Sequence, residues 1–192
     1  MALIIIDENM QIGKGRHRKC YKHPFNSNQC IKVNYSGHNS QQSEDPKNYR
    51  LLQKNGIDWT HLAKFYGSCK TNIGVGLIFE LIKDFNGRVS KSLDYKLKRG
   101  DFLNNCECLH KELFKLKEYT LEYLIFLRNI SCRNILVQYP SKEKYRLVIV
   151  DDIGCKELIP IYRFSKRLTK IKIEKRWAKF FRQMNYLKPL NK

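Results

Sequence analysis

The sequence is poor in acidic residues and has no long apolar run. Its 192 residues include 18 Asp and Glu against 37 Lys and Arg, so the formal net charge is +19. This excess favours a polyanionic partner, and nucleic acid, nucleotide phosphate and an anionic membrane surface all stay open. No apolar stretch approaches the roughly 18 residues of a membrane-spanning helix. The sequence therefore predicts a chain without a transmembrane segment.

Disulfide and secretion signals are also missing. The seven cysteines include no Cys-x-x-Cys pair, and their number is odd. This pattern argues against a disulfide framework and favours a reducing compartment. The N-terminal stretch MALIIIDENMQIG has no basic leader and no small-residue cleavage site. These absences predict a soluble, cytoplasmic protein.

Several common site motifs are absent as well. No helix-turn-helix, zinc-finger or RNA-stacking signature accompanies the charge, so sequence-specific recognition of nucleic acid is not expected. No Ser/His/Asp or Cys/His nucleophile arrangement has a local motif. Two groups of histidines and cysteines lack the spacing of zinc ligands: His17, Cys20 and His23, and Cys106, Cys108 and His110. We therefore expect no zinc site.

The first third of the chain has the pattern of β-structure. Short runs separated by turn-forming residues predict strands. They lie at Arg18–His23, Gln29–Tyr35, Phe65–Cys69 and Gly76–Ile82, and a helix begins at Pro46.

The later part is richer in helical patterns. Apolar residues at steps of three and four predict a long amphipathic helix over Asp101–Phe126. Two short strands follow at Ile135–Tyr139 and Arg146–Val150, and then a basic helix over about Phe164–Tyr186. We predict a single α+β domain over residues 1–192, with a β-rich N-lobe (1–82) and a truncated helical C-lobe (83–192).

Four features follow the chain order of the protein-kinase fold. The first is the segment Gly13-Lys14-Gly15. Because glycine has no side chain, the two glycines let backbone N–H groups approach phosphates. Arg18 stands where a third glycine is usual. The second feature, Lys32, lies where a strand lysine contacts the α- and β-phosphates of ATP. Glu80, near the end of the strand Gly76–Ile82, completes the expected cofactor-binding set.

The other two features are candidate Mg²⁺ ligands. Asn134 follows the long helix, and Asp151 or Asp152 ends a later strand, where oxygen ligands suit Mg²⁺ bound to ATP phosphates. Turn residues capping the strand would explain the second aspartate equally well. Asn129 occupies the catalytic-aspartate position five residues before Asn134, and an amide cannot act as a general base. Two alternatives stay open: a nucleotide-binding pseudokinase, or a phosphotransferase whose carboxylate comes from Asp152 or Glu157.

A longer series of strings resembles the bacterial YrbL family of PhoP regulatory network proteins. It consists of IGKGRHRKCYKHP, CIKV, DW, FYG, FELIKDFNG, NIL, DDIG and LIP, from about Ile12 to Trp177. The resemblance implies a reduced, two-lobed protein-kinase-like fold of poorly known activity, with a protein partner in bacterial regulatory signalling. Together with the four features above, it leads to the hypothesis of a domain that binds ATP and Mg²⁺. It matches Asp151 to the family's strand-ending aspartate, so Asp151 is expected to bind the metal and Asp152 remains a catalytic candidate.

The C-terminal segment concentrates the positive charge. Nine Lys or Arg residues lie between Arg163 and Arg182, against the single acid Glu174. The segment also has an apolar stripe: Phe164, Leu168, Ile171, Trp177, Phe180, Phe181 and Met184. In one interpretation this stripe packs on the C-lobe and the bases are solvated. In another, residues 163–182 make a non-specific polyanion contact with nucleic acid or anionic lipid, and the protein is a non-enzymatic polyanion- or partner-binding regulator.

Overall fold

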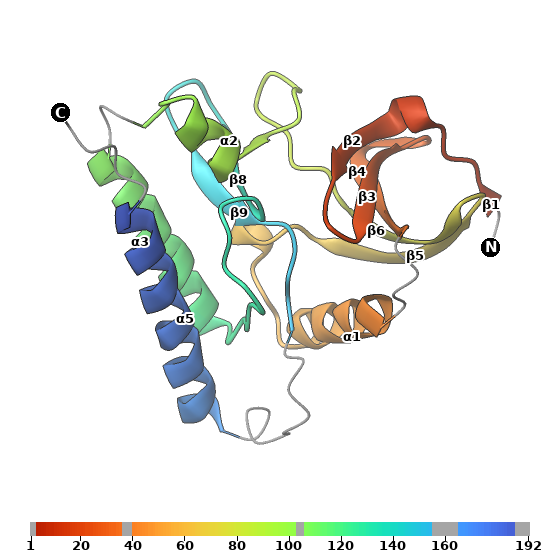
Figure 1. Cartoon of the computed structure of the whole chain (residues 1–192). Helices are drawn as coiled ribbons and strands as arrows, with labels where there is room; N and C mark the ends of the chain where they lie inside the picture. The colour runs from red at the N-terminus through yellow and green to blue at the C-terminus, as the bar shows by residue number, and fades with distance from the viewer. Residues whose placement is uncertain (1–2, 36–39, 103–105, 155–164, 187–192) are drawn as a thin grey trace. The chain divides into compact units, whose positions relative to one another are not determined.

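The structure is a computed structural model that describes residues 3–35, 40–102, 106–154 and 165–186; for residues 40–45, 185 and 186 it describes the backbone alone. Figure 1 shows strands and helices in both halves of the chain, so the α+β class is confirmed. The kinase-like arrangement stays a prediction. In chain order the elements are β1 (Leu3–Ile4), η1 (Glu8–Met10), β2 (Gln11–Lys14), β3 (Arg18–His23), β4 (Asn26–Asn34), α1 (Ser40–Lys54), η2 (Trp59–His61), β5 (Phe65–Thr71), β6 (Gly74–Glu80), β7 (Lys91–Ser92), α2 (Leu93–Lys98), α3 (Cys106–Glu122), β8 (Ile135–Gln138), β9 (Arg146–Ile149) and α5 (Lys166–Tyr186).

The strands form two sheets. The larger has six strands in the order β1-β5-β6-β4-β3-β2, and the smaller has three in the order β7-β8-β9. In the larger sheet β1 pairs parallel to β5, whereas the other pairs are antiparallel. Within the described residues, every helix is too short or too polar to cross a bilayer.

The chain divides into two compact units. Unit 1 contains Met1–Ser90 and Gln138–Val148, and unit 2 contains Lys91–Val137 and Ile149–Lys192. Residues 138–148 belong with unit 1 partly through two hydrogen bonds. Phe85 N donates to Tyr139 O at 2.7 Å, and Tyr139 N donates to Asp84 Oδ1 at 3.0 Å.

The sheet of unit 1 has two differently covered faces. Directly opposed residues of an antiparallel pair share a face, and neighbours along a strand point to opposite faces. Cys20, Lys32 and Leu77 are in register across β3, β4 and β6, and they define the Lys32 face. Their neighbours Tyr21, Ile31 and Ile78 define the Ile31 face.

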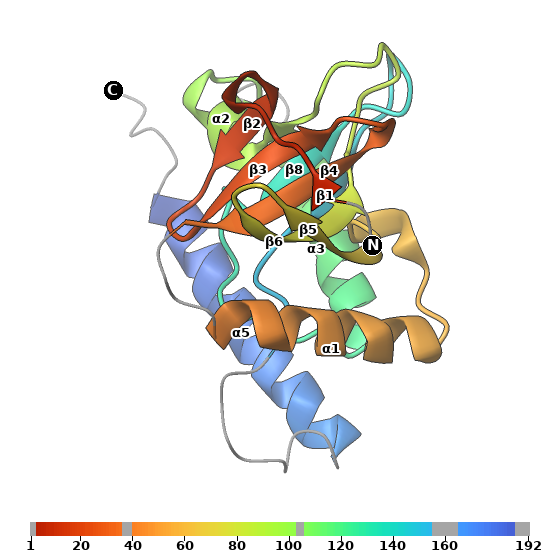
Figure 2. The ribbon, with the colours of Figure 1, turned by 90° about the vertical axis from the view of Figure 1, so that its right-hand side faces the viewer.

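Both faces are packed. On the Ile31 face, the buried residues Tyr21, Ile31, Val33 and Cys69 pack with Ile6 of the N-terminal segment. On the Lys32 face, α1 lies along the sheet (Figures 1 and 2). Its Tyr49 contacts the Phe79 ring, with the centroids 5.2 Å apart, and the Phe65 ring at 5.5 Å. Apolar burial on two sides fixes the register of β4, which carries Lys32.

Gly76 of β6 lies at the tightest point of this packing. A Cβ atom added there would overlap Ile31 Cγ2 and would lie 3.1 Å from Cys69 Sγ. Because both neighbours belong to the buried core, we expect Gly76→Ala to lower the free energy of unfolding by about 1–3 kcal/mol. Urea unfolding of the two proteins measures this difference. Gly87→Ala is not a suitable control because its φ is +79°, so Ser68→Ala, at an exposed position of β5, should change the stability by less than about 0.5 kcal/mol.

Unit 2 is organised around two helices that lie side by side. The contacts Trp177–Thr120 and Phe181–Phe114 show that α5 runs antiparallel to α3, as Figure 1 shows. Trp177 is fully buried, and its Nε1 donates to Thr120 Oγ1 at 2.8 Å. The buried stripe of α5, made of Thr169, Ile173, Trp177 and Phe180, has the spacing of one helix face.

The elements differ from the sequence-based expectations in several places. The helix predicted over Asp101–Phe126 is shorter, because α3 ends at Glu122 and Leu124 has φ 52°, which a right-handed helix does not accommodate. The short helix α2 was not predicted. The helix expected to begin at Pro46 begins at Ser40.

The predicted apolar stripe of the basic helix is wrong in its first half. Leu168 is 42% exposed and Ile171 is 39% exposed, whereas Thr169 and Ile173 are buried. The buried face is set by Trp177 and Phe180, and counting back from them in steps of three and four reaches Ile173 and Thr169. Phe164 lies outside the described residues.

Candidate functional site

The glycine segment forms the turn between β2 and β3. Gly13 pairs with Cys20, and the register shifts between Gln11 and Gly13. Gly15 N donates to Arg18 O at 2.8 Å, which closes the turn over Arg16 and His17. Gly13 and Lys14 thus end strand β2, and Gly15 begins the tight turn that leads to β3.

Tyr35, which follows β4, holds the carbonyl side of this turn. Its hydroxyl donates to Gly15 O at 2.9 Å and to Arg16 O at 3.0 Å, and its backbone N donates to His17 O at 3.1 Å. Lys14 Nζ lies 5.4 Å from the centroid of the Tyr35 ring. The analysis of the sequence did not identify Tyr35, because a tyrosine at a strand end has no distinctive pattern.

The fold itself has room for side chains at both glycines. A Cβ atom on Gly13 would lie 3.8 Å from Cys20 Cβ, and one on Gly15 would lie 3.5 Å from Arg18 O. Both distances are ordinary van der Waals contacts, and neither residue has a positive φ. Packing therefore does not explain these glycines, which fits a turn that a ligand approaches.

Two cations are buried on the Lys32 face. Lys32 is 9% exposed, and its Nζ lies 4.6 Å from the centroid of the Phe79 ring. Arg18 is 8% exposed. It lies two residues before Cys20 in β3, so the two side chains share a face, and Cys20 is paired with Lys32 of β4. Arg18 and Lys32 are therefore diagonal neighbours on one face. Two neighbouring cations on one face of a sheet suit the negative oxygens of a phosphate group, because charge-assisted hydrogen bonds to such oxygens are strong.

The cysteine next to Lys32 does not supply such a negative charge. A hydrogen bond with the Cys20 side chain, and then burial, raise the pKa of the Cys30 thiol well above its usual value. Cys30 therefore stays a neutral thiol at physiological pH. Its Sγ also donates to Glu80 O at 3.7 Å.

Glu80 forms hydrogen bonds with Lys64, the residue directly before β5. Its Oε2 accepts from Lys64 N at 3.2 Å, and its backbone N donates to Lys64 O at 2.8 Å. The carboxylate thus has a structural contact, and its expected place in the cofactor-binding set stays a prediction. The acids near Lys32 in sequence, Glu44 and Asp45, fall in α1 but their side chains lie outside the described part.

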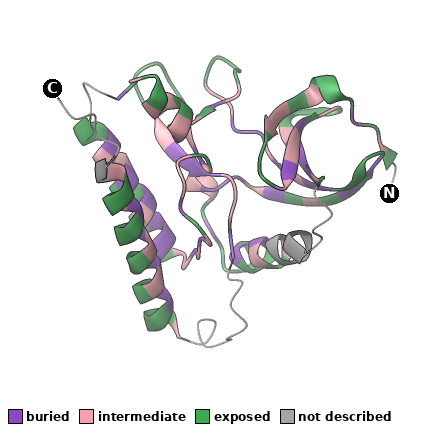
Figure 3. Cartoon of the chain, viewed as in Figure 1, coloured by how far each residue is buried: buried purple, intermediate pink, exposed green. Residues whose placement is uncertain are grey.

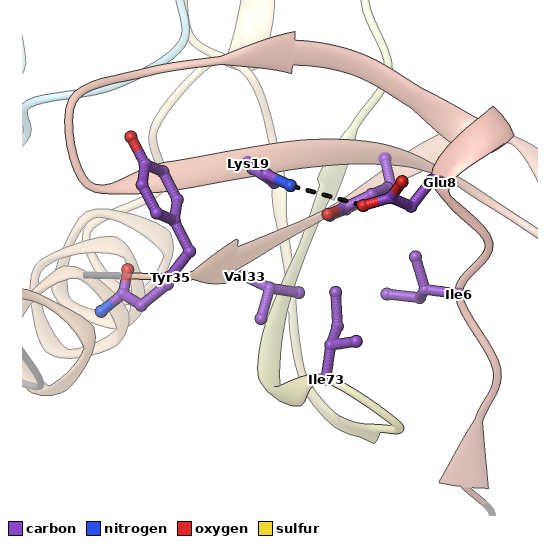
Figure 4. A pocket seen from close by; sticks show the side chains of 8 residues that line it. Ile6, Glu8, Lys19, Val33, Tyr35 and Ile73 are labelled. Carbon is purple, nitrogen blue, oxygen red and sulfur yellow. Dashed lines mark ion pairs between the residues drawn. The ribbon is translucent and has the colours of Figure 1, made fainter. Parts of the chain in front are cut away.

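A hollow of about 190 Å³ lies on the other side of the sheet. Its lining includes Ile6, Tyr21 and Val33 of the Ile31 face, together with Lys19 and Glu8, whose Nζ and Oε1 atoms are 3.8 Å apart (Figure 4). Tyr21 and Val33 lie on the face opposite to Lys32. None of the predicted nucleotide-binding residues lines this hollow, whereas Tyr35, which contacts the glycine turn, does.

In unit 2, the structure brings Asn134 and Asp152 together. Val150 N donates to Asn134 O at 3.0 Å, so the start of β8 lies next to the residues that follow β9. Asn134 Nδ2 donates to Asp152 Oδ2 at 2.6 Å. Asp151 turns its carboxylate to the backbone instead, since its Oδ1 accepts from Asp152 N at 2.8 Å. The geometry favours Asp152 over Asp151 as the partner of Asn134.

Asp152 also has an unusual backbone conformation. Its φ is 67°, in the left-handed region that few non-glycine residues adopt. Such strained residues cluster at functional sites, where the surrounding contacts hold them in place. Here Arg128 N donates to Asp152 O at 2.8 Å, and Gly154 N donates to Phe126 O at 2.8 Å.

Arg128 is the charged neighbour of this pair. Its Nε lies 3.7 Å from Asp152 Oδ1, and its side chain is 9% exposed. Its carbonyl accepts from an Arg176 guanidinium nitrogen, and that guanidinium lies 4.6 Å from the centroid of the Phe126 ring. Arg128 was not predicted from the sequence, although its position directly before Asn129 was a usable signal.

Asn129 itself is exposed. An amide cannot accept a proton, so Asn129 is not a general base, and its match to a kinase catalytic aspartate stays a prediction. In the same loop, burial raises the pKa of the Cys132 thiol to about 11. A thiol with that pKa is not a base at neutral pH either. The alternative carboxylate, Glu157, lies outside the described residues.

The donor atoms of unit 2 fit a magnesium ion bound through few protein ligands. Asn134 uses its Nδ2 toward Asp152, so its Oδ1 is the atom suited to a cation. An amide oxygen and a carboxylate are the hard ligands that Mg²⁺ prefers, and Mg²⁺ on nucleotides commonly uses one or two carboxylates plus phosphates. No group of three or more Asp, Glu, His or Cys residues suited to a metal occurs in the described ranges, so a metal held by the protein alone is not indicated there.

The predicted site residues thus fall into two sets. Gly13, Lys14, Gly15, Arg18, Lys32 and Glu80 lie in unit 1, and Asn129, Asn134, Asp151 and Asp152 lie in unit 2. Within unit 1 the sheet brings Arg18 and Lys32 onto one face. Within unit 2 the loops bring Asn134 and Asp152 into hydrogen-bond contact.

Comparison with known proteins agrees with the family resemblance seen in the sequence. Residues 4–185 match the model of a family described as PhoP regulatory network protein YrbL. A protein of Escherichia coli (strain K12) with the description "Uncharacterized protein YrbL" is 30% identical over 184 residues, which cover 94% of this chain and 88% of that protein. A protein of Shigella flexneri with the same description matches to the same extent.

Proposed function

Since the chain belongs to the YrbL family of PhoP regulatory network proteins, we propose that it is a regulatory protein that binds ATP with Mg²⁺. The observation that carries this proposal is the contact between Asn134 and Asp152, in which a strained aspartate is followed by Ile153 and Gly154. Protein kinases bind their metal ions through two such residues. One is the aspartate of an Asp-x-Gly segment, and the other is an asparagine about one hairpin earlier in the chain.

Each residue has a role in this proposal. Backbone N–H groups of the Gly13–Arg18 turn and the cations Lys32 and Arg18 bind phosphate oxygens, since charge-assisted hydrogen bonds are the strong ones. Asn134 and Asp152 hold Mg²⁺, which when bound neutralises charge on the phosphates. Asp151, the residue first expected to bind the metal, orients the strained backbone through its contact with Asp152 N.

The proposal favours a pseudokinase over an atypical phosphotransferase. Asn129 provides no base, and Asp152 is engaged by Asn134 and by Arg128. A carboxylate that holds a metal and contacts a guanidinium is a poor proton acceptor at neutral pH, because both neighbours favour its charged form. We therefore propose that the protein acts on a partner in the regulatory network by binding a nucleotide, and not by transferring a phosphoryl group.

Titration with a fluorescent ATP analogue tests the proposal. We expect Lys32→Ala to weaken binding about tenfold or more, because a hydrogen bond to a charged group contributes about 1.5–3 kcal/mol. Lys22→Ala is the matched control, since it removes the same charge from an exposed position of the neighbouring strand β3. Equal affinities of Lys32→Ala and Lys22→Ala would contradict the nucleotide site.

The glycine turn provides a second test. Gly15→Ala fits the fold without overlap, so we expect its melting temperature to stay within a few degrees of the original. A methyl group there interferes with the close approach of phosphates to the backbone, so affinity for ATP should fall several-fold. Differential scanning calorimetry and the same ATP titration measure the two effects. Lower stability with unchanged affinity would show that the glycine is structural.

A second candidate function rests on a different observation. Six of the eight bases in α5 are exposed: Lys166, Arg167, Lys170, Lys175, Lys179 and Arg182. We propose that this surface gives the protein a polyanion contact, independent of ATP. Binding to heparin that weakens steeply between low and moderate salt supports it, and no binding at low salt would contradict it.

A further inference from the structure

The exposed surface of α5 combines basic and aliphatic side chains. Figure 3 shows buried and exposed positions in helical alternation along this helix. With 3.6 residues per turn, the side opposite to Ile173 and Trp177 carries one set of exposed residues. We call this set the basic–apolar face: Arg167, Leu168, Ile171, Lys175, Ala178, Lys179 and Arg182.

The bases of this face are available to a ligand. Arg167, Lys175, Lys179 and Arg182 form no ion pair with any other described residue. By contrast, Lys172 and Arg176 stand nearer the buried side and lie over the Phe126 ring, at 5.7 and 4.6 Å. The helix thus uses two of its bases within unit 2 and presents the others to solvent.

Two aliphatic side chains that are partly exposed to solvent lie among these bases. Leu168 is 42% exposed and Ile171 is 39% exposed, and they are three residues apart, on one side of the helix. At the edge of the helix pair, Phe114 of α3 is 53% exposed and stacks on Phe181, with the ring centroids 5.2 Å apart. Lys111 and Lys115 flank Phe114 and are exposed too.

The mixture of side chains discriminates between polyanions. A phosphodiester backbone makes favourable electrostatic contacts with the bases but has no apolar surface that Leu168 and Ile171 could contact. An anionic bilayer makes favourable contacts with both kinds of side chain. A helix lying in the interface places its bases near the headgroups and its aliphatic side chains at the acyl boundary. Aromatic rings such as Phe114 also gain from that boundary.

We propose that the basic–apolar face of α5 binds the surface of an anionic lipid bilayer, with the helix lying in the plane of the interface. This inference rests on the polyanion contact proposed above and names the polyanion. It does not depend on ATP. No helix of the described residues is suited to cross the bilayer, so the contact is peripheral and reversible.

Sedimentation of the full chain with lipid vesicles tests the inference. We expect binding to vesicles of phosphatidylcholine mixed with phosphatidylglycerol and little binding to phosphatidylcholine alone. The double variant Lys175→Ala, Lys179→Ala should partition about 25-fold less, since each base near an anionic surface contributes about fivefold. Lys22→Ala with Lys70→Ala removes the same charge from exposed positions of unit 1 and should bind as the original does.

The aliphatic residues decide between the two sources of negative charge. Leu168→Ser with Ile171→Ser keeps every charge and alters only exposed positions, so the fold is retained. We expect vesicle binding of this variant to fall about tenfold or more, while its binding to heparin stays unchanged. Equal loss of both, or unchanged vesicle binding, overturns the lipid inference but leaves the polyanion contact standing. If the original chain binds neither vesicles nor heparin at low salt, both proposals fail.

Discussion

Trp177→Ala is expected to lower the free energy of unfolding by about 3–5 kcal/mol. The indole is fully buried between α3 and α5, where it contacts the rings of Phe180 and Phe181 at 5.5 and 5.6 Å. Removing it leaves a cavity, and it also removes the donor to Thr120 Oγ1. Chemical unfolding followed by circular dichroism measures the change.

Two further variants separate the contributions of packing and hydrogen bonding. Trp177→Phe keeps most of the ring volume but leaves the buried Thr120 without its donor, so we expect a loss of about 1–3 kcal/mol. Lys179→Ala, an exposed neighbour on α5, should change the stability by less than about 0.5 kcal/mol. A Trp177→Ala protein as stable as Lys179→Ala would show that α5 does not form part of the core of unit 2.

Asp152→Asn is expected to remove the effect of Mg²⁺ on ATP binding. The substitution keeps the shape of the side chain, and asparagine tolerates the left-handed φ of 67° at this position, so the fold should persist. Loss of the carboxylate charge should weaken Mg-ATP binding at least tenfold, which corresponds to about 1.4 kcal/mol. Calorimetric titration with ATP at fixed Mg²⁺ gives the affinities.

Asp151→Asn is the matched variant, because it removes the same charge one residue away. Asp151 accepts a hydrogen bond from Asp152 N, and asparagine Oδ1 can accept the same bond. We therefore expect a smaller loss of affinity than in Asp152→Asn. The reverse order, with Asp151→Asn losing more, would restore Asp151 as the metal ligand and contradict the assignment from the hydrogen-bond geometry.

Local patterns predicted the strands of the N-terminal half well. Arg18–His23 coincides with β3, and the glycine turn before it lies where the sequence placed it. Turn-forming residues between these runs marked their limits, which is a strong local signal. The short β1 and β7 were not predicted, because two residues carry no period.

Helix ends and solvent-facing sides were predicted less well, since both depend on tertiary packing. Leu124 stops α3 by its backbone conformation, which the continuing apolar pattern through Phe126 conceals. On α5 an apolar residue every three to four positions is compatible with two faces. The deep burial of Trp177 beside Thr120 selects one of them and leaves Leu168 and Ile171 exposed.

The site residues were found from their order in the chain, whereas their roles needed the structure. The sequence left Asp151 and Asp152 as alternatives, because both end the same strand. The structure separates them through the contact of Asp152 with Asn134 and through its positive φ. Tyr35 was missed because it acts through contacts with the glycine turn that no motif marks. Arg128 was missed although it directly precedes Asn129, because its contact with Asp152 is visible only in the structure.

The most direct test of the central claim is the affinity of the unmodified chain for ATP with and without Mg²⁺, measured by isothermal titration calorimetry. If Asn134 and Asp152 hold the ion while Lys32 and the glycine turn hold the phosphates, ATP should bind, and Mg²⁺ should tighten binding about tenfold or more. Absence of ATP binding in the presence of Mg²⁺, or an affinity indifferent to the ion, would contradict the account.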